Sequence, residues 1–388
     1  MRVLHVITRL ILGGAQENTL LTVEGLLREP GVEVALATGP ALGPEGELFH
    51  RAAEHQVPVH VVQEMRREIH PGRDLTSFFH LASLMRQFRP DVVHTHSSKA
   101  GIIGRAAARA ANVSVIVHTI HGLPFHPYES RLNNLLFVAL ERAAARWTTA
   151  LISVADAMTR QALAEGVGRP EQYVTVYSGM EVEPFLAVRG RRAECRRELG
   201  LPTEGAVLSK VARLASLKGH EDVLRALPAV VERVPDLTVV FAGDGALREQ
   251  LERLAAELGL APRVRFLGLV PPARIPTIVG ASNAMVHASY REGLARVLPQ
   301  ALLAGVPVVS YDVDGAGEAL QTGEGGVLVP PGDIRALAAG LTDVLSDPER
   351  WQASARARGD LITERFRAET MVAQILALYR RLLAARRP

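Results

Sequence analysis

The sequence predicts an α/β protein built from two doubly wound parallel sheets, each covered by helices on both faces. The chain has 388 residues, more than one hydrophobic core usually organises. Short runs of β-branched residues alternate with helical patterns along almost the whole chain. A changeover near residues 178–184 is followed by a charged segment and a fresh strand pattern, so we expect two domains of similar size.

Residues 1–183 are predicted to form the first domain, which is Rossmann-like. Its expected strands are 3–8, 32–37, 59–62, 92–95, 113–119, 150–153 and 173–176. The expected helices between them are 16–27, 75–88, 99–110 and 132–146. This order of elements is typical of a parallel sheet, because each crossover needs a helix.

Residues 184–364 are predicted to form a second Rossmann-like domain, and residues 365–388 a C-terminal helix with a basic end. The expected strands of the second domain are 207–211, 237–242, 264–267, 284–287 and 308–311. Its expected helices are 219–234, 246–258, 297–304 and 333–345. Ligands of such sheets bind outside the carboxyl ends of the strands, so two domains facing each other are expected to share one central cleft.

Composition and charge exclude several classes of protein. Apolar residues make up 48% of the chain and charged residues 22%, which excludes a wholly disordered chain. The net charge of +3 is too small to argue for binding to nucleic acid. A single cysteine, Cys195, permits no internal disulfide and fits a reducing compartment. No apolar run is long enough to span a membrane, so we expect a cytoplasmic protein.

The first strand pattern runs into Gly13-Gly14 and then into a helical pattern. Glycines at this place let the backbone approach a ligand, and the helix N-terminus presents amides to an anion. The G-x-G-x-x-G fingerprint is missing, which disfavours a nicotinamide-dependent dehydrogenase. A tight turn without any ligand remains an open alternative at this stage.

The second domain carries a stronger pattern. Arg213 and Lys218 follow a predicted strand, and Lys218 is one of only three lysines in the chain. Two fixed cations at the carboxyl end of a strand could neutralise a diphosphate, although a pair of solvated surface charges is the alternative. A Gly-Asp-Gly turn at 243–245 and a Glu292-Gly293-Leu294 turn before the helix at 297–304 follow two later strands.

Four segments in this order resemble glycosyltransferase family 4. They are R-L-x3-K-G from Arg213, F-A-G-D-G-x-L from Phe241, V-R-F-L-G from Val264 and E-G-L-x5-Q-A-L-x-A-G-V-P-V-V from Glu292. The resemblance covers nearly the whole chain and implies the GT-B fold, in which the C-terminal helix crosses back to the first domain. It implies a retaining, metal-independent transferase with a nucleotide-sugar donor and no other cofactor. Residues 121–126 are similar to members of capsule, exopolysaccharide and O-antigen assembly.

The resemblance also implies roles for individual residues. Arg213 and Lys218 would hold the donor diphosphate, and His121 would face the transferred sugar. Together with Glu292 they are the expected catalytic residues. The expected donor-binding residues are Gly13, Gly14, Arg213, Lys218, Leu267, Gly268, Glu292, Gly293, Leu294, Ala295 and Gln300.

One position departs from the family's pattern. The usual E-x7-E ends here in Gln300 instead of glutamate. A glutamine amide can hydrogen-bond ribose hydroxyls but lacks the charge that strengthens such bonds. We expect donor binding weakened by about 1 kcal/mol and activity retained, because Gln300 is not a catalytic group in this scheme.

The chemistry of the expected site requires no metal. Arg213, Lys218 and a helix N-terminus could stabilise negative charge growing on the leaving phosphate. No second carboxylate is evident for a nucleophile, which favours front-side displacement over the double displacement of retaining glycosidases. His94 and His96 share one face of a strand, so a zinc site is an alternative. Neither a carboxylate nor a cysteine accompanies them at ligand spacing, and we expect no metal.

Segment 86–160 holds nine basic and four acidic residues. This excess predicts attraction to anionic lipid or to a diphosphate-linked acceptor, and peripheral association with the inner face of a membrane. Ordinary solvated helix faces are the alternative.

We therefore expect transfer from a UDP-sugar to a lipid-linked or carbohydrate acceptor. A non-catalytic nucleotide-sugar-binding protein and a UDP-sugar epimerase or synthase of the same fold are the alternatives.

Overall fold

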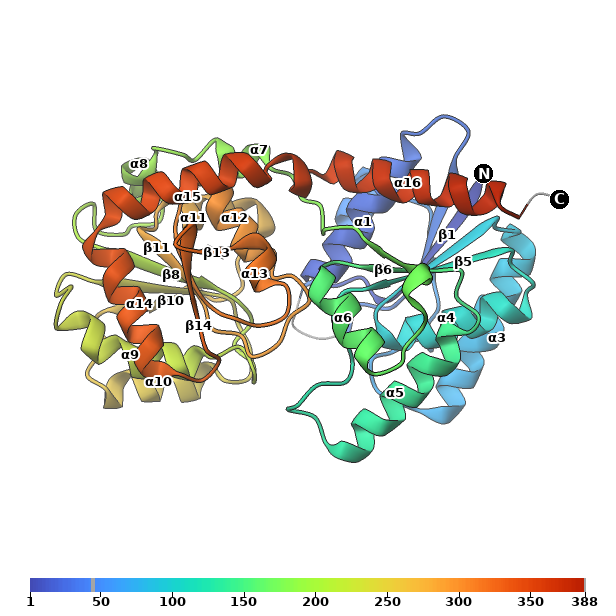
Figure 1. The fold of residues 1–388 in the computed structure, drawn as a ribbon, viewed down its shortest axis with the longest axis horizontal. Coiled ribbons are helices and arrows are strands. Elements are labelled where there is room, and N and C mark those ends of the chain that lie inside the picture. The colour runs from blue at the N-terminus through green and yellow to red at the C-terminus, as the bar shows by residue number, and fades with distance from the viewer. Residues whose placement is uncertain (43–45, 387–388) are drawn as a thin grey trace. The chain divides into compact units, whose positions relative to one another are not determined.

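The computed structural model describes residues 1–42 and 46–386. The chain divides into two compact units (Figure 1). Unit 1 comprises Met1–Met180 and Arg365–Pro388, and unit 2 comprises Glu181–Glu364. Each unit is a parallel sheet covered by helices on both faces, so the predicted fold class is confirmed.

Unit 1 contains a seven-stranded parallel sheet of order β3-β2-β1-β4-β5-β6-β7. Its strands are β1 (Arg2–Arg9), β2 (Glu33–Gly39), β3 (Val59–Val61), β4 (Val92–His96), β5 (Val115–Ile120), β6 (Ala150–Ser153) and β7 (Tyr173–Thr175). Every strand expected in this half is present, with ends shifted by one or two residues. The central strand β1 is buried on both faces, which explains its almost continuous apolar sequence.

The helices of unit 1 cover the two faces of this sheet separately. They are α1 (Gly14–Leu27), α2 (Phe49–Glu54), α3 (Pro71–Phe88), α4 (Ser98–Ala110), α5 (Arg131–Ala145), α6 (Asp156–Ala164) and α16 (Ala368–Ala384). Val3 and Ile7 pack in one core with α1 and α16, whereas Leu4 and Val6 pack in another with α3 and α4. The alternation follows from the two-residue period of a strand.

The C-terminal segment belongs to unit 1, although it follows unit 2 in the sequence. A short 3-10 turn (Glu364–Phe366) precedes α16, so the helix expected at 365–388 begins slightly later. The Met180 amide donates to the Phe366 carbonyl at 2.8 Å. Val372 of α16 packs closely on Gly25 of α1, where an added Cβ would lie 2.5 Å from the Val372 side chain. This contact holds α16 beside α1 (Figure 1), and Tyr379 of α16 packs in the core against β1.

Unit 2 contains a second seven-stranded parallel sheet of order β10-β9-β8-β11-β12-β14-β13. Its strands are β8 (Val207–Val211), β9 (Thr238–Ala242), β10 (Val264–Phe266), β11 (Ala284–His287), β12 (Val308–Tyr311), β13 (Gln321–Thr322) and β14 (Gly325–Val329). The last two strands were not predicted, because β13 is very short and two glycines open β14.

The longer helices of unit 2 are α9 (His220–Val231), α10 (Arg248–Glu257), α14 (Ile334–Ser346) and α15 (Pro348–Ile362). The shorter ones are α7 (Glu183–Leu186), α8 (Arg192–Glu198), α11 (Ile275–Gly280), α12 (Val297–Leu303) and α13 (Ala316–Ala319). Helices α9, α10 and α14 cover the face that carries Leu208, and α8 and α11 cover the face that carries Val207. The charged segment that follows residues 178–184 thus forms the helix α8 rather than an open linker.

Candidate functional site

Loops that follow four neighbouring strands of unit 2 meet at the carboxyl edge of its sheet. The Leu214 amide after β8 donates to the Asp244 carbonyl after β9 at 3.0 Å. The Gly243 amide donates to Gly268 after β10 at 2.9 Å, and the Tyr290 amide after β11 donates to Leu217 at 2.9 Å. These bonds bring the four sequence motifs together at one edge, where ligands of such sheets bind.

Two glycines make this convergence possible. Gly219 has a φ of 64°, and a Cβ on it would lie 1.9 Å from the Ala288 carbonyl oxygen. Gly243 has a φ of 146°, and a Cβ there would lie 2.0 Å from the Ala212 carbonyl oxygen. Any side chain at these positions would push the β8–α9 loop, which carries Arg213 and Lys218, away from the neighbouring loops.

Lys218 and Glu292 form an ion pair at the centre of these loops. About a quarter of each side chain is exposed, so both can meet a ligand. The Glu292 amide donates to Asp314 Oδ2 at 2.6 Å, and His287 Nε2 lies 3.7 Å from Glu292 Oε1. Burial opposes ionisation of Glu292, but the Lys218 ammonium and the nearby His287 outweigh it and hold the pKa of Glu292 well below its usual range.

The other predicted donor residues of unit 2 lie on the loops that follow its strands and on α12. Arg213 is exposed on the same loop as Lys218. The Leu267 amide donates to Phe241 at 2.9 Å and the Gly268 carbonyl accepts from Gly243, so both groups already bond within the unit. Gln300 lies half-buried on α12. Gly293, Leu294 and Ala295 are buried in the turn before α12.

Behind the ion pair lie polar residues that the sequence did not single out for function. Lys210 of β8 is 1% exposed, and its Nζ has no hydrogen-bond partner among the described residues. Burial, and then the neighbouring Lys218, lower the pKa of Lys210 to about 7. His220 at the start of α9 is also buried, and burial lowers its pKa far below the usual value. The available signal was a lysine inside a strand that is buried along most of its length.

In unit 1 the predicted residues lie at the carboxyl edge of the first sheet. Gly14 opens α1, and the Gly13 carbonyl accepts the Glu17 amide at 2.9 Å. His121 follows β5 directly. It lines a cavity of about 240 Å³ together with His118, Ser97 and Glu141. This cavity therefore contains the one histidine for which the resemblance implies a role.

His121 stands at the end of a buried chain of hydrogen bonds. Its Nε2 lies 3.0 Å from His96 Nδ1, and His96 Nε2 lies 2.9 Å from His5 Nδ1. His5 Nε2 lies 3.5 Å from the Tyr379 hydroxyl, which lies 2.5 Å from His94 Nδ1. Burial lowers the pKa of His5 to about 3 and those of His94 and His96 well below their usual values, so these imidazoles are neutral.

Neutral imidazoles give this chain a direction, because each has one N–H and one acceptor nitrogen. If the Tyr379 hydroxyl donates in its short bond to His94, its oxygen can only accept from His5 Nε2–H. His5 Nδ1 then accepts from His96 Nε2–H, and His96 Nδ1 accepts from His121 Nε2–H. In a neutral His121 this arrangement makes Nδ1 a hydrogen-bond acceptor, the state suited to a sugar hydroxyl.

The same histidines are the one cluster among the described residues that could hold a metal ion. Ring nitrogens of His5, His94 and His96 lie within 4.8 Å of one another, so the sequence found two of the three. The cluster contains no carboxylate or cysteine, and His5 already bonds to His96. A divalent cation there would be a buried charge without an anionic ligand, which is costly.

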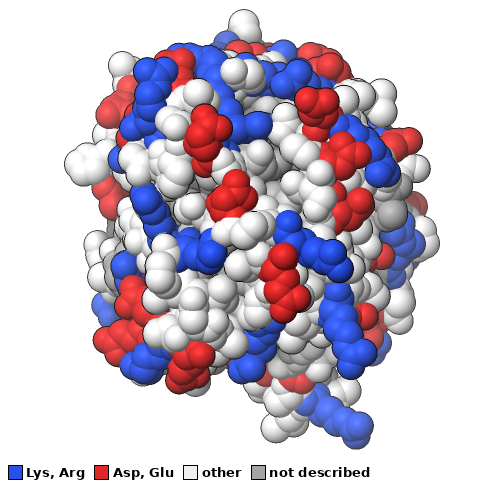
Figure 2. Space-filling view, turned by 90° about the vertical axis from the view of Figure 1, so that its left-hand side faces the viewer, with Lys and Arg blue, Asp and Glu red and all other residues white. Residues whose placement is uncertain are grey.

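One charged pair of segment 86–160 is buried, and charges of both signs mix on the face that Figure 2 shows. Arg105 and Glu141, one basic and one acidic residue of segment 86–160, form a buried ion pair at 2.6 Å. Because the pair removes one charge of each sign, the excess of basic over acidic residues at the segment's surface is unchanged. Among the described side chains on the face in Figure 2, basic and acidic groups alternate without gathering into a patch of one sign. None of the described helices is long and apolar enough to cross a membrane.

Comparisons with known proteins agree with this geometry. Residues 13–179 match the family model of the glycosyl transferase 4-like domain, and residues 191–359 match that of glycosyl transferases group 1. An Escherichia coli enzyme named UDP-Gal:alpha-D-GlcNAc-diphosphoundecaprenol alpha-1,3-galactosyltransferase is 28% identical over 350 residues, 89% of this chain and 88% of that protein. Glycogen synthase of Mycobacterium tuberculosis H37Rv is 30% identical over 308 residues, 78% of this chain and 70% of its own.

Solved structures share the fold. HepE of Anabaena, solved in complex with UDP-glucose, has a TM-score of 0.81 at 23% identity and covers 97% of this chain and 99% of its own. Sucrose-phosphate synthase of Thermosynechococcus elongatus has a TM-score of 0.85 at 22% identity, covering 99% of this chain and 100% of its own. Two family models, a relative matched over most of its length and a shared fold thus agree, and the chain belongs to the GT-B glycosyltransferases of the family 4 type.

Proposed function

We propose that this glycosyltransferase uses a UDP-sugar, retains the anomeric configuration, needs no metal ion and transfers to a lipid-linked or carbohydrate acceptor in surface polysaccharide synthesis. The observation that carries the proposal is the Lys218–Glu292 ion pair, held with Arg213 where four loops of unit 2 meet. Fixed cations at that edge suit a diphosphate, and they supply the charge that a metal ion would otherwise supply.

The choice of UDP rests on relatives and on the fold. The E. coli relative is named for UDP-Gal, and HepE was solved with UDP-glucose. In this chain the turn around Leu267 and Gly268 would receive the base, and Gln300 of α12 the ribose hydroxyls. Since the Leu267 amide and the Gly268 carbonyl already bond within the unit, other backbone groups of that turn would pair with the base.

The transfer step follows from these charges. The bond between the anomeric carbon and the diphosphate oxygen breaks, and the bond to the acceptor oxygen forms on the same face of the sugar. The acceptor hydroxyl gives its proton to the leaving phosphate oxygen, so no separate base is required. Arg213 and Lys218 would stabilise the charge that grows on the leaving diphosphate. Glu292 would orient Lys218 and hold the sugar.

Unit 1 suits the acceptor side. The cavity at His121 is lined by the neutral His118 and by hydroxyl groups, which match sugar hydroxyls better than phosphate. Helix α5 carries exposed leucines at helical spacing, and Leu132 and Leu135 are 76% and 70% exposed. An apolar helix face among basic residues fits contact with a lipid surface.

Release of nucleoside diphosphate from UDP-, GDP-, ADP- and TDP-sugars in the presence of a chelator tests the proposal. Wild type is compared with Lys218→Ala and with Arg225→Ala, an exposed arginine on α9, as the control. We expect release from a UDP-sugar that Lys218→Ala abolishes and Arg225→Ala preserves, and NMR of the product should show the donor's anomeric configuration. Activity that requires added metal, that inverts the product or that survives in Lys218→Ala would contradict the proposal.

A further inference from the structure

A second cavity of unit 1 is lined by four arginines. It measures about 280 Å³, and its charged lining residues are Arg9, Arg66, Arg67, Arg73 and Glu68. Arg9 ends β1, Arg66 and Arg67 precede α3, and Arg73 lies in the first turn of α3. Among the described lining residues, Arg66, Arg67 and Arg73 stand against one carboxylate, that of Glu68, which leaves an excess of two positive charges without counting Arg9.

The printed contacts of Arg66 and Arg73 in this arginine pocket do not cancel their positive charge. Arg66 donates to the Gln63 carbonyl at 3.5 Å, and this carbonyl carries no charge. Arg73 Nε is buried without a hydrogen-bond partner among the described residues. Its own backbone amide, and then Arg73 and Arg9, lower the pKa of Glu68, which is therefore ionised and still outnumbered.

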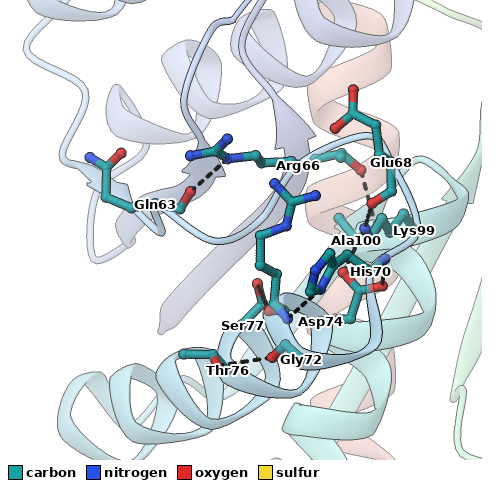
Figure 3. A network of polar contacts seen from close by, with 12 residues as sticks. Gln63, Arg66, Glu68, His70, Gly72, Asp74, Thr76, Ser77, Lys99 and Ala100 are labelled. Carbon is teal, nitrogen blue, oxygen red and sulfur yellow. Dashed lines mark hydrogen bonds and ion pairs between the residues drawn. The ribbon is translucent and has the colours of Figure 1, made fainter.

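A network of polar contacts fixes the backbone segments that carry the pocket's arginines (Figure 3). Lys99 of α4 pairs with Asp74 at 2.6 Å and donates to the backbone carbonyl of Glu68. The His70 amide donates to Asp74 Oδ2 at 3.1 Å, and the Arg73 amide donates to His70 Nδ1 at 3.3 Å. One of the chain's three lysines thus ties the segment with Arg66 and Arg67 to α3 and α4, so the pocket does not need to order itself on binding.

The chemistry of this pocket selects a phosphate-rich ligand. Guanidinium groups bind phosphate oxygens in pairs of hydrogen bonds, and a diphosphate offers enough charge and oxygens for several of them. Apolar side chains lie next to the arginines: Ile69 and Leu75 are 71% and 57% exposed, and Leu42 of the lining is 49% exposed. Cations beside exposed apolar residues match an amphiphile with an anionic head and a hydrocarbon tail.

We propose that the arginine pocket of unit 1 binds the diphosphate of a lipid-diphosphate-linked acceptor, with the lipid leaving over Ile69 and Leu75. The inference rests on the proposed function, because it names the acceptor class of that transferase. It makes Arg66 and Arg67 acceptor-binding residues, separate from the donor residues of unit 2. The ligand's polar head would be recognised by its two phosphates rather than by its sugar.

Binding of the full-length protein to four probes tests this assignment by calorimetry. The probes are farnesyl diphosphate, farnesol, UDP and phosphatidylglycerol vesicles. The double variant Arg66→Gln/Arg67→Gln should lose about 100-fold in affinity for farnesyl diphosphate, about tenfold for each charge-assisted contact, and keep its affinity for UDP. Arg73→Lys, which retains the charge but not the planar fork, should lose about tenfold. Arg86→Gln, an exposed arginine in the last turn of α3, is the matched control and should change nothing.

Three results would overturn the assignment. Unchanged binding of farnesyl diphosphate in the double variant excludes the pocket. A parallel loss of UDP binding would assign the arginines to the donor, and a parallel loss of binding to phosphatidylglycerol vesicles would make them a general membrane contact. The binding measurement does not require the protein to transfer a sugar. A protein that binds farnesyl diphosphate through these arginines but releases no nucleotide from any donor would refute the proposed function and support the pocket.

Discussion

The two sheets of this glycosyltransferase end in polar clusters of opposite electrical character. At the carboxyl edge of unit 2, Lys218 and Glu292 are ionised and pair with each other. At the same edge of unit 1, His121 ends a chain of imidazoles that burial keeps neutral. The comparison shows that one kind of sheet can end in two electrically different clusters. Under the proposed function, the charged cluster would stabilise a phosphate and the neutral hydrogen-bonding groups would orient hydroxyls.

Burial explains the difference. Lys218 and Glu292 keep about a quarter of their side-chain surface, so water and the partner charge stabilise both ions. His5 and His96 are almost completely buried, and a proton on His96 would meet other imidazoles instead of carboxylates. Ionisation there is costly, and the chain satisfies its polar atoms through hydrogen bonds between neutral groups.

The largest expected effect is on the charged side. Glu292→Gln keeps the shape of the side chain but removes its charge, which leaves Lys218 without its ionic partner. We expect turnover to fall by about 10³-fold, because a preorganised charge acts at the reacting centre. Steady-state kinetics measures this fall in turnover, with the donor that the nucleotide-release experiment identifies. A fall of less than about fivefold would show that the ion pair is not part of the catalytic machinery.

The second prediction concerns the buried Lys210 behind that pair. Its pKa is about 7 in the folded chain, below the usual value of 10.5, so the unfolded chain binds the proton more tightly. Stability should therefore rise with pH between about 7 and 10.5, and the cost of burying the ammonium is fully present below pH 7. Lys210→Met should raise the free energy of unfolding at pH 6 by at most about 5 kcal/mol and flatten this pH dependence.

Urea unfolding at pH 6 and pH 9 checks this expectation. The matched control is Lys99→Met, which removes a lysine that is paired with Asp74 and should lower stability instead. A Lys210→Met protein that is less stable than wild type at pH 6 would mean that the buried amine has a partner after all, such as ordered water.

The third prediction concerns the neutral side. Tyr379→Phe removes the hydroxyl that gives the histidine chain its direction but preserves the ring that packs in the core. We expect ¹⁵N NMR of the wild type to show the Nε2–H tautomer at His5, His94, His96 and His121. In the variant, mixed tautomers should appear, kcat should fall about tenfold and the KM for the donor should stay the same.

A Tyr311→Phe protein is the matched control, because it loses an equally buried hydroxyl, bonded to Asp222 at 2.7 Å in unit 2. Its histidine signals should be those of the wild type. Nδ1–H tautomers or charged imidazoles at His96 and His121 in the wild type would reverse the direction derived for the chain. Zinc that shifts the signals of His5, His94 and His96 at micromolar concentration would favour a metal site instead.

The smallest expected effect tests the departure at position 300. Gln300→Glu restores the charge that the family usually carries there, and we expect donor nucleotide to bind about fivefold tighter, about 1 kcal/mol. Titration of UDP measures it. If Gln300→Ala and Gln300→Glu both bind UDP as the wild type does, Gln300 does not contact the ribose.

Much of the loop cluster at the carboxyl edge of unit 2 could be predicted because its residues are close together in short motifs. The motifs at Arg213, Phe241, Val264 and Glu292 each follow a strand, and parallel strands bring their carboxyl ends to one edge. The partners Asp314 and His287 were missed because neither stands in a motif. Their only signal is that His287 ends one strand of this sheet and Asp314 follows another.

The sequence by itself determined the alternation of strands and helices, the two sheets and the motif residues at their carboxyl edges, because these follow from local periodicity and turn chemistry. Only the tertiary structure decided which polar residues meet. His5, His96 and Tyr379 are far apart in the chain and join because β1 and β4 are neighbouring strands and α16 packs on a face of their sheet. The arginine pocket likewise gathers Arg9 and Arg73 from distant elements. Burial and charge depend on such neighbours, and spacing along the chain does not encode them.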